Sequence, residues 1–218
     1  MKDTMAGPYE VESKWTISRH DYDQLIGQCS LVKRVEQLNV YFDERWTLAD
    51  AGATCRIRFS RNESPTFTLK VPVSWDSTGT RRSIEIESPA RAAFTHFSLF
   101  LTTFDFEDFA PEVRRALQPL RISKLRRVGR MRNVRQVLLL PSGRSFELDS
   151  FTLPGGERGY EVEIEEDDDL VRAAIVSEIC EIIPSALPSR VSKFQRFTEA
   201  ARRRRESSDS TPKALRPS

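Results

Sequence analysis

The sequence predicts an α+β protein in which an eight-stranded antiparallel β-barrel forms a tunnel and helices pack on its outside. Eight segments alternate polar or charged residues with apolar ones, which is the pattern of a strand with two unlike faces. Short turn-forming stretches separate most of these segments, as in antiparallel sheets. Segments with apolar residues at helical spacing lie between them and would cover the apolar faces from outside. The charged faces would then line the interior.

The first predicted strand spans residues 9–17. Glu10, Glu12 and Lys14 recur with period two and point to one face. The opposite face, which includes Val11 and Trp15, is apolar enough to pack on a core. Taken alone, this pattern also fits an edge strand whose charges face water. The same division into a charged and an apolar face recurs in the later strands, and this recurrence favours a charged interior.

A short helix is predicted over residues 18–30, with Ser18 as a suitable N-cap and apolar residues at helical spacing. Four predicted strands follow, at residues 37–43, 54–60, 66–73 and 81–88. Their polar phase contains Asn39, Tyr41, Asp43, Arg56, Arg58, Thr66, Thr68, Lys70, Glu85 and Glu87. Each of these strands repeats the division into one polar and one apolar face.

Residues 89–117 are predicted to form a helical segment with Pro89 in its first turn. An apolar stripe runs along this segment and consists of Phe94, Phe97, Phe100, Leu101 and Phe104. Packing on the outside of the sheet explains this stripe better than a cofactor site does.

The strand pattern then resumes at residues 129–141, 144–152 and 159–166. The polar phase of these strands contains Arg135, Glu147, Asp149, Glu161, Glu163 and Glu165. Acidic residues 167–169 open a helix that runs to about Ile183, as the helix dipole favours. A short final helix begins at Lys193. We expect one domain over residues 1–200 and a basic, disordered tail over residues 201–218.

Composition excludes several classes of protein. The 34 basic and 32 acidic residues give a net charge of only +2, which does not favour a role in coating nucleic acid. Cys29, Cys55 and Cys180 are far apart, so neither a zinc site nor a disulfide framework is expected. No apolar run reaches membrane-spanning length and no signal-peptide core is evident. We expect a cytoplasmic monomer or homodimer without a membrane or a specific nucleic-acid partner.

The charged interior points to the chemistry of a ligand. A dry tunnel filled with unpaired charges would be prohibitively unstable, so the interior must be open to water and bind something of matching charge. One set of side chains suits phosphate oxygens and consists of Lys14, Arg56, Arg58, Lys70, Arg135 and Lys193. Another set offers hard oxygen ligands for Mg²⁺ or Mn²⁺ and consists of Glu10, Glu12, Asp149, Glu163 and Glu165. A chain of phosphates with bound divalent cations satisfies both sets at once.

The stretch Glu10-x-Glu12-x-Lys14 resembles the ExExK signature of the CYTH superfamily, the triphosphate tunnel metalloenzymes. The resemblance continues in family order over about residues 9–197. It includes Tyr41-Phe42-Asp43, Arg56-Ile57-Arg58, Thr68-Leu69-Lys70, Glu85-Ile86-Glu87, Glu147-Leu148-Asp149, Glu163-Ile164-Glu165 and Ser192-Lys193-Phe194. Two positions depart from the family pattern, because Asn133 and Ser83 stand where a basic residue is usual.

The resemblance implies an eight-stranded tunnel that hydrolyses or cyclises a triphosphate with a divalent metal. It implies that metal is held by Glu10, Glu12, Glu163 and Glu165, with Asp149 as a further ligand or acting through water. It implies phosphate contacts from Lys14, Arg56, Arg58, Lys70 and Arg135. Lys193 would close one tunnel mouth and contact the terminal phosphate. Glu85 and Glu87 would position a second metal or the attacking water.

The function that these expectations favour is hydrolysis of inorganic tripolyphosphate or a small organic triphosphate with Mg²⁺ or Mn²⁺. The general base would be Lys70 with Tyr41 nearby, since a lysine among other cations can have a lowered pKa, or Glu87 acting on water. A class IV-type adenylate cyclase and a non-catalytic polyphosphate- or nucleotide-binding module are the alternatives. A thiamine triphosphatase would need a cradle for the thiamine, for which Trp15, Trp46 and Trp75 are candidates.

Overall fold

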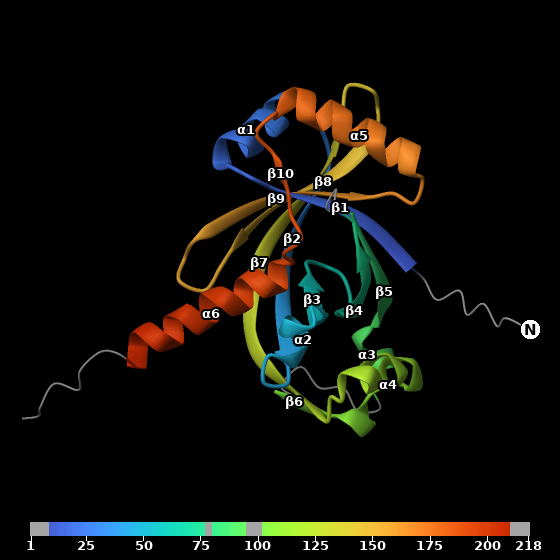
Figure 1. The fold of residues 1–218 in the computed structure, drawn as a ribbon, viewed down its shortest axis with the longest axis vertical. Helices are drawn as coiled ribbons and strands as arrows, with labels where there is room; N and C mark the ends of the chain where they lie inside the picture. The colour runs from blue at the N-terminus through green and yellow to red at the C-terminus, as the bar shows by residue number, and fades with distance from the viewer. Residues whose placement is uncertain (1–8, 77–79, 95–101, 210–218) are drawn as a thin grey trace, which may run out of the picture.

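Eight antiparallel strands form a closed ring in the computed structural model, which describes residues 9–76, 80–94 and 102–209 (Figure 1). The order around the ring is β1-β5-β4-β3-β2-β7-β8-β9, and β9 pairs again with β1. The ring confirms the predicted eight-stranded antiparallel architecture with helices outside it.

The strands and helices have the following bounds. The ring strands are β1 (Tyr9–Ile17), β2 (Ser30–Asp43), β3 (Thr54–Ser60), β4 (Thr66–Trp75), β5 (Thr80–Pro89), β7 (Lys124–Leu139), β8 (Ser145–Thr152) and β9 (Arg158–Glu165). Short strands β6 (Thr103–Asp105) and β10 (Leu187–Pro188) pair with β7 and β1 respectively. The α-helices are α1 (Arg19–Gln28), α2 (Thr47–Asp50), α3 (Ala90–Ala93), α4 (Pro111–Leu117), α5 (Asp169–Ile182) and α6 (Lys193–Asp209). Two 3₁₀ turns are η1 (Phe106–Asp108) and η2 (Gln118–Leu120).

The register of the ring brings charged side chains to its interior. Directly opposed residues on neighbouring strands share a face of the sheet. Lys14 lies opposite Glu163 where β1 meets β9, and Lys70 lies opposite Glu85 where β4 meets β5. The charged phase of one strand therefore continues in the charged phase of the next.

The apolar faces of the strands point outward into two cores. Helices α1 and α5 cover one end of the ring, where Leu25 and Ile175 pack with Trp15, Leu148 and Val162. The second core is rich in aromatic side chains and includes Phe42, Phe67, Phe94, Phe104, Phe109, Val113 and Leu117. Each such apolar side chain stabilises the fold by about 1.5–3 kcal/mol on burial. The helices thus cover the apolar faces, as the alternation requires.

Helix α1 begins where its sequence predicts. Ser18 Oγ accepts a hydrogen bond from the backbone N–H of Asp21 (3.1 Å), and Asp21 Oδ2 accepts one from the backbone N–H of Ser18 (2.9 Å). This reciprocal pair is a capping box, which satisfies two of the free donors at a helix start.

Two strands begin at least five residues before the start that the alternation predicts. Strand β2 begins at Ser30 rather than at residue 37, and β7 begins at Lys124 rather than at residue 129. The two strands pair from Ser30–Leu139 to Asp43–Arg126, with β-bulges along the way. The extension is decided by this long-range pairing, which local alternation does not show.

The segment from residue 89 to 117 is not one helix, and that prediction is wrong. It contains α3, β6, η1 and α4. Phe94 and Phe104 do pack as expected, with their rings stacked 4.2 Å apart in the core. Phe97, Phe100 and Leu101 lie outside the described residues. Bulky aromatic packing against the sheet overrides the helical spacing.

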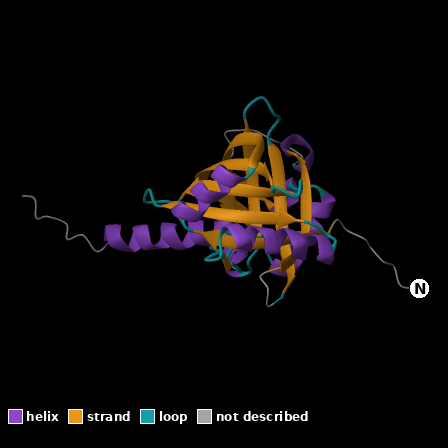
Figure 2. Ribbon diagram, turned by 90° about the horizontal axis from the view of Figure 1, so that it is seen from above, coloured by secondary structure: helices purple, strands orange, loops and turns teal. Residues whose placement is uncertain are grey.

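The final helix is longer than expected. Helix α6 runs to Asp209, through the basic run 202–205 that we assigned to a disordered tail. Phe197 and Ala200 anchor its first half in the core, and Ala201 and the arginines that follow favour the helical state. Figures 1 and 2 show its second half projecting beyond the ring. Within the described ranges, no helix has the length and apolarity needed to cross a bilayer.

Candidate functional site

The ring encloses a cavity of about 760 Å³. This volume is within the usual range for a site that holds a small molecule. Its charged lining divides into carboxylates and basic groups. The carboxylates belong to Glu10, Glu12, Glu85, Glu87, Glu147, Glu163, Glu165, Glu166 and Asp167. The basic groups belong to Lys14, Arg56, Arg58, Lys70, Arg81, Arg135 and Lys193.

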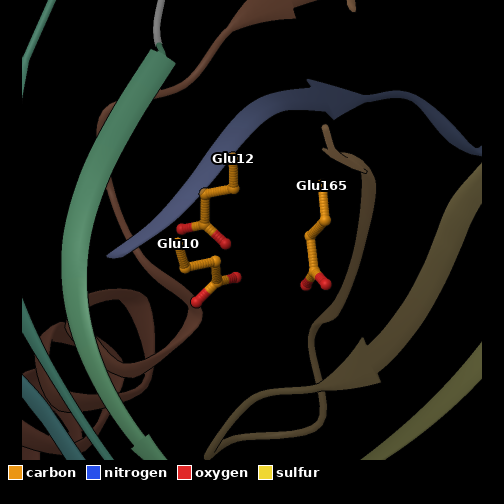
Figure 3. A group of neighbouring side chains, drawn as sticks. All are labelled: Glu10, Glu12 and Glu165. Carbon is orange, nitrogen blue, oxygen red and sulfur yellow. The ribbon is translucent and has the colours of Figure 1, made fainter. Parts of the chain in front are cut away.

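Two groups of carboxylates could each hold a metal ion. Glu10, Glu12 and Glu165 form the first group, and Figure 3 shows their carboxylates directed toward a common space between β1 and the end of β9. Glu147, Glu163 and Glu165 form the second group, so Glu165 is shared. Within each group one oxygen per residue lies within 4.8 Å of the others. Mg²⁺ or Mn²⁺ holds oxygens at about 2.1 Å, which places opposite ligands about 4.2 Å apart, so both groups fit such an ion.

The electrostatics of these groups also fit a cation. Burial raises the pKa of Glu10 to about 7, despite the attraction of Lys70, and burial raises the pKa of Glu147 to about 7. The carboxylates of Glu12 and Glu165 raise the pKa of Glu10 further. A divalent cation would relieve this crowding of negative charge.

Metal binding to this site should release protons. Glu10 and Glu147 are protonated below about pH 7 and must lose their protons before their oxygens bind metal. We expect Mn²⁺ affinity to fall by about tenfold or more between pH 8 and pH 6. Calorimetry in two buffers of different ionisation enthalpy measures the released protons. Equal affinity at both pH values, with no proton release, would contradict this expectation.

The same shifts act on the stability of the metal-free protein in a defined direction. Between the ordinary pKa of 4.5 and about 7, the folded state binds more protons at these two groups than the unfolded chain does. Their contribution to the free energy of unfolding is therefore largest at low pH and decreases as the pH rises through this window.

Lys70 lies among carboxylates. Its Nζ donates to Glu10 Oε1 (2.7 Å) and to Glu12 Oε2 (2.9 Å), and it lies 3.6 Å from Glu85. We expected Lys70 to act as a general base because it would lie among other cations. Its contacts are with carboxylates instead. At this position the Lys70 ammonium group balances the charge of the carboxylates, and it would also be able to bind a phosphate in the cavity.

Arg56 and Arg58 form the basic wall on β3. The charge of Arg56, followed by burial, lowers the pKa of Arg58 to about 10. Arg58 Nε donates to Asn39 Oδ1 at 3.4 Å, a neutral acceptor. Crowded guanidinium groups of this kind suit an anion, because a bound phosphate would offset their mutual repulsion.

Arg81 is a cavity residue that the sequence analysis missed. Its side chain is 1% exposed, its Nη1 lies 3.7 Å from Glu12 Oε1, and its Nη2 donates to the Gly52 carbonyl (3.1 Å). The sequence could have indicated this position, because Arg81 lies on the same face of β5 as Glu85 and Glu87.

Arg135 joins three carboxylates from two strands. Its guanidinium forms ion pairs with Glu147 and Glu163, and donates to Asp149 at 3.0 and 2.7 Å. Asp149 is fully buried and also accepts from Asn133 Nδ2 (3.1 Å). Asp149 therefore lies behind the cavity wall, where a role toward metal would have to act through water.

Helix α6 closes part of the cavity. Tyr41 stacks on Phe194 with ring centroids 4.8 Å apart and contacts Phe197 at 5.2 Å. Phe197 in turn lies against Gly129, where a Cβ atom would come within 2.3 Å of its ring. Burial raises the pKa of the Tyr41 phenol, so this group stays protonated at neutral pH and can donate a hydrogen bond.

The ring brings nearly all the predicted site residues together. Those on the cavity wall are Glu10, Glu12, Lys14, Tyr41, Arg56, Arg58, Lys70, Glu85, Glu87, Arg135, Glu163, Glu165 and Lys193. Asp149 is the exception. Glu147, which we placed in the polar phase without a role, belongs to a carboxylate group that could bind metal.

Comparisons with known proteins give a consistent picture. A family model described as CYTH domain matches residues 8–198. HpAC1 from Hippeastrum, described as having a dominant triphosphatase activity, is 23% identical, with a TM-score of 0.66 over 87% of this chain and 95% of that one. The Bacillus halodurans protein bh2851, named as a candidate adenylate cyclase, is 24% identical, with a TM-score of 0.61 over 86% of this chain and 96% of that one. PH1819 from Pyrococcus horikoshii is 17% identical, with a TM-score of 0.56 over 87% of this chain and 98% of that one. No curated protein matches the sequence.

Proposed function

Because the chain belongs to the CYTH domain family, we propose that it is a divalent-metal-dependent triphosphatase that hydrolyses inorganic tripolyphosphate or a small organic triphosphate. One observation supports this most directly. Carboxylates on β1, β8 and β9 face arginines on β3 across one cavity, so the cavity offers ligands for metal and for phosphate together. A site for an anion alone would not need so many carboxylates.

The residues divide into two roles in this proposal. Metal would be held by Glu10, Glu12, Glu147, Glu163 and Glu165. When bound, Mg²⁺ or Mn²⁺ supplies charge neutralisation and polarises the phosphoryl group. Phosphate would be held by Arg56, Arg58, Lys14, Lys70 and Lys193, which fix the geometry for in-line attack by water.

Glu87 is our proposed acceptor for the proton of the attacking water. Its carboxylate lies on the cavity wall of β5 and accepts a hydrogen bond from Thr68 Oγ1 (3.3 Å). Lys70, the other candidate, contacts three carboxylates and is better placed to bind phosphate. Tyr41 would donate a hydrogen bond rather than accept the proton.

The test is phosphate release from tripolyphosphate, ATP and thiamine triphosphate, each with Mg²⁺ or Mn²⁺. We expect rapid release from tripolyphosphate that depends on the metal. Pyrophosphate and cyclic AMP from ATP, without phosphate release, would assign a cyclase instead. If tripolyphosphate raises the melting temperature but no substrate is turned over, the protein is a binding module and the proposal is wrong.

A further inference from the structure

Two cations on α6 share one buried carboxylate. Lys193 and Arg196 are three residues apart, so their side chains lie on the same face of the helix. Lys193 Nζ lies 2.8 Å from Glu161 Oε2, and Arg196 Nη2 lies 2.5 Å from Glu161 Oε1. Glu161 is 0% exposed and does not line the cavity, whereas Lys193 does. The Glu161 carboxylate thus contacts Lys193 from the buried side, away from the cavity.

Arg196 ties several elements to this carboxylate. Its Nη2 also donates to Thr16 Oγ1 on β1 (2.9 Å), to Ser189 Oγ (3.0 Å) and to the Val191 carbonyl (3.3 Å). Ser189 and Val191 belong to the linker between β10 and α6. One guanidinium therefore fastens the linker and the helix to the ring beside Lys193.

The charges around Lys193 determine how available it is to a phosphate. Its Nζ contacts Asp149 (2.7 Å) and Glu163 (2.7 Å) in addition to Glu161. Arg135 offsets the charge of Asp149 and Glu163. Among the described residues, Arg196 is the second cation in an ion pair with Glu161, and the charge of Lys14 also acts on this carboxylate. Without Arg196, Lys193 would have to compensate a larger share of this buried charge. A buried carboxylate that loses one partner binds the remaining one more strongly.

We infer that the ion pair between Arg196 and Glu161 positions Lys193 and leaves its charge available to bind a substrate phosphate. The inference rests on the proposed function of the cavity, because it assigns the anion that Lys193 meets there. It makes Arg196 a positioning residue, since its contacts are with Glu161, β1 and the linker.

The test measures tripolyphosphate binding to the full chain by calorimetry in EDTA, so that hydrolysis does not enter, and then KM and kcat with metal. Arg196→Gln should weaken binding and raise KM by about tenfold, while kcat changes by less than about threefold. Arg196→Lys keeps a cation at Glu161 and should bind within about threefold of the wild type. In a Glu161→Gln background, Arg196→Gln should cost less than about twofold, because the charge to be balanced is gone.

A matched control is Arg202→Gln. Arg202 lies on the same helix and pairs with Asp50 (2.8 Å) on α2, away from Lys193. It should leave tripolyphosphate affinity unchanged. If Arg196 serves only to hold the helix, Arg196→Gln will lower the melting temperature equally in both Glu161 backgrounds without changing affinity, and the inference is wrong.

Different outcomes of these experiments contradict the proposed enzyme activity and the proposed role of Arg196. A wild-type protein that binds tripolyphosphate without hydrolysing it refutes the proposed enzyme, and the binding series still decides the role of Arg196. A wild-type protein that does not bind tripolyphosphate refutes the inference.

Discussion

Replacement of Glu12 by glutamine should reduce metal-dependent phosphate release by about 10²–10³-fold, the effect expected for loss of one charged group that stabilises a transition state. Glu12 is 3% exposed and belongs to the carboxylate group of Glu10 and Glu165. Burial alone would raise its pKa, but Lys14 and Lys70 outweigh burial and lower the pKa of Glu12 to about 2. The carboxylate of Glu12 is therefore charged throughout the neutral pH range. Glutamine keeps the size of the side chain and removes the charge of a proposed metal ligand.

A second measurement separates metal loss from collapse of the site. Tripolyphosphate binding in EDTA should be retained or strengthened in Glu12→Gln, because one negative charge has left a cavity that must hold an anion. Glu36→Gln, at an exposed position on β2, is the control and should match the wild type in both assays. Full activity of Glu12→Gln would contradict the proposed role of Glu12 as a metal ligand.

Replacement of Arg135 by methionine should lower the free energy of unfolding by about 3–5 kcal/mol. The side chain is 12% exposed and forms ion pairs with Glu147, Asp149 and Glu163. Burial would lower the pKa of Arg135, but these three carboxylates hold it well above its ordinary value. Without the guanidinium, the three carboxylates would repel one another at positions that are largely buried. The loss comes mainly from uncompensated charge rather than from lost packing, since methionine keeps an unbranched apolar chain in place of the aliphatic part of arginine.

Arg132→Met provides the comparison for this stability measurement by urea denaturation. Arg132 is exposed on the same strand, β7, and surface substitutions of this kind usually change stability by less than about 0.5 kcal/mol. Mg²⁺ should restore part of the stability of Arg135→Met, because it would bind the freed carboxylates. Equal stability of the two variants would mean that the buried carboxylates take up protons instead of repelling one another.

Which side chains face the interior could be predicted from the sequence alone. Alternation at period two is a local property of an extended chain, so residues such as Glu10, Arg56 and Glu163 could be assigned to one face without knowing their neighbours. The charge on that face, and the apolar character of the other, then required an interior open to water and helices outside the ring. These predictions hold because local geometry and burial agree.

Which of these side chains contact one another depends on the fold of the whole chain. The register between β1 and β9 sets Glu12 opposite Glu165, and the return of α6 places Lys193 and Arg196 at Glu161. Such contacts join residues far apart in the chain, and their geometry depends on pairing between whole strands, which no local pattern encodes. For the same reason the sequence placed Asp149 and Glu147 in one polar phase, and we assigned a role toward metal to Asp149 but none to Glu147. In the folded ring, Arg135 and Glu147 line the cavity, whereas Asp149 is fully buried behind the cavity wall. Closure of the ring therefore gives two residues of one strand phase different distances from the cavity.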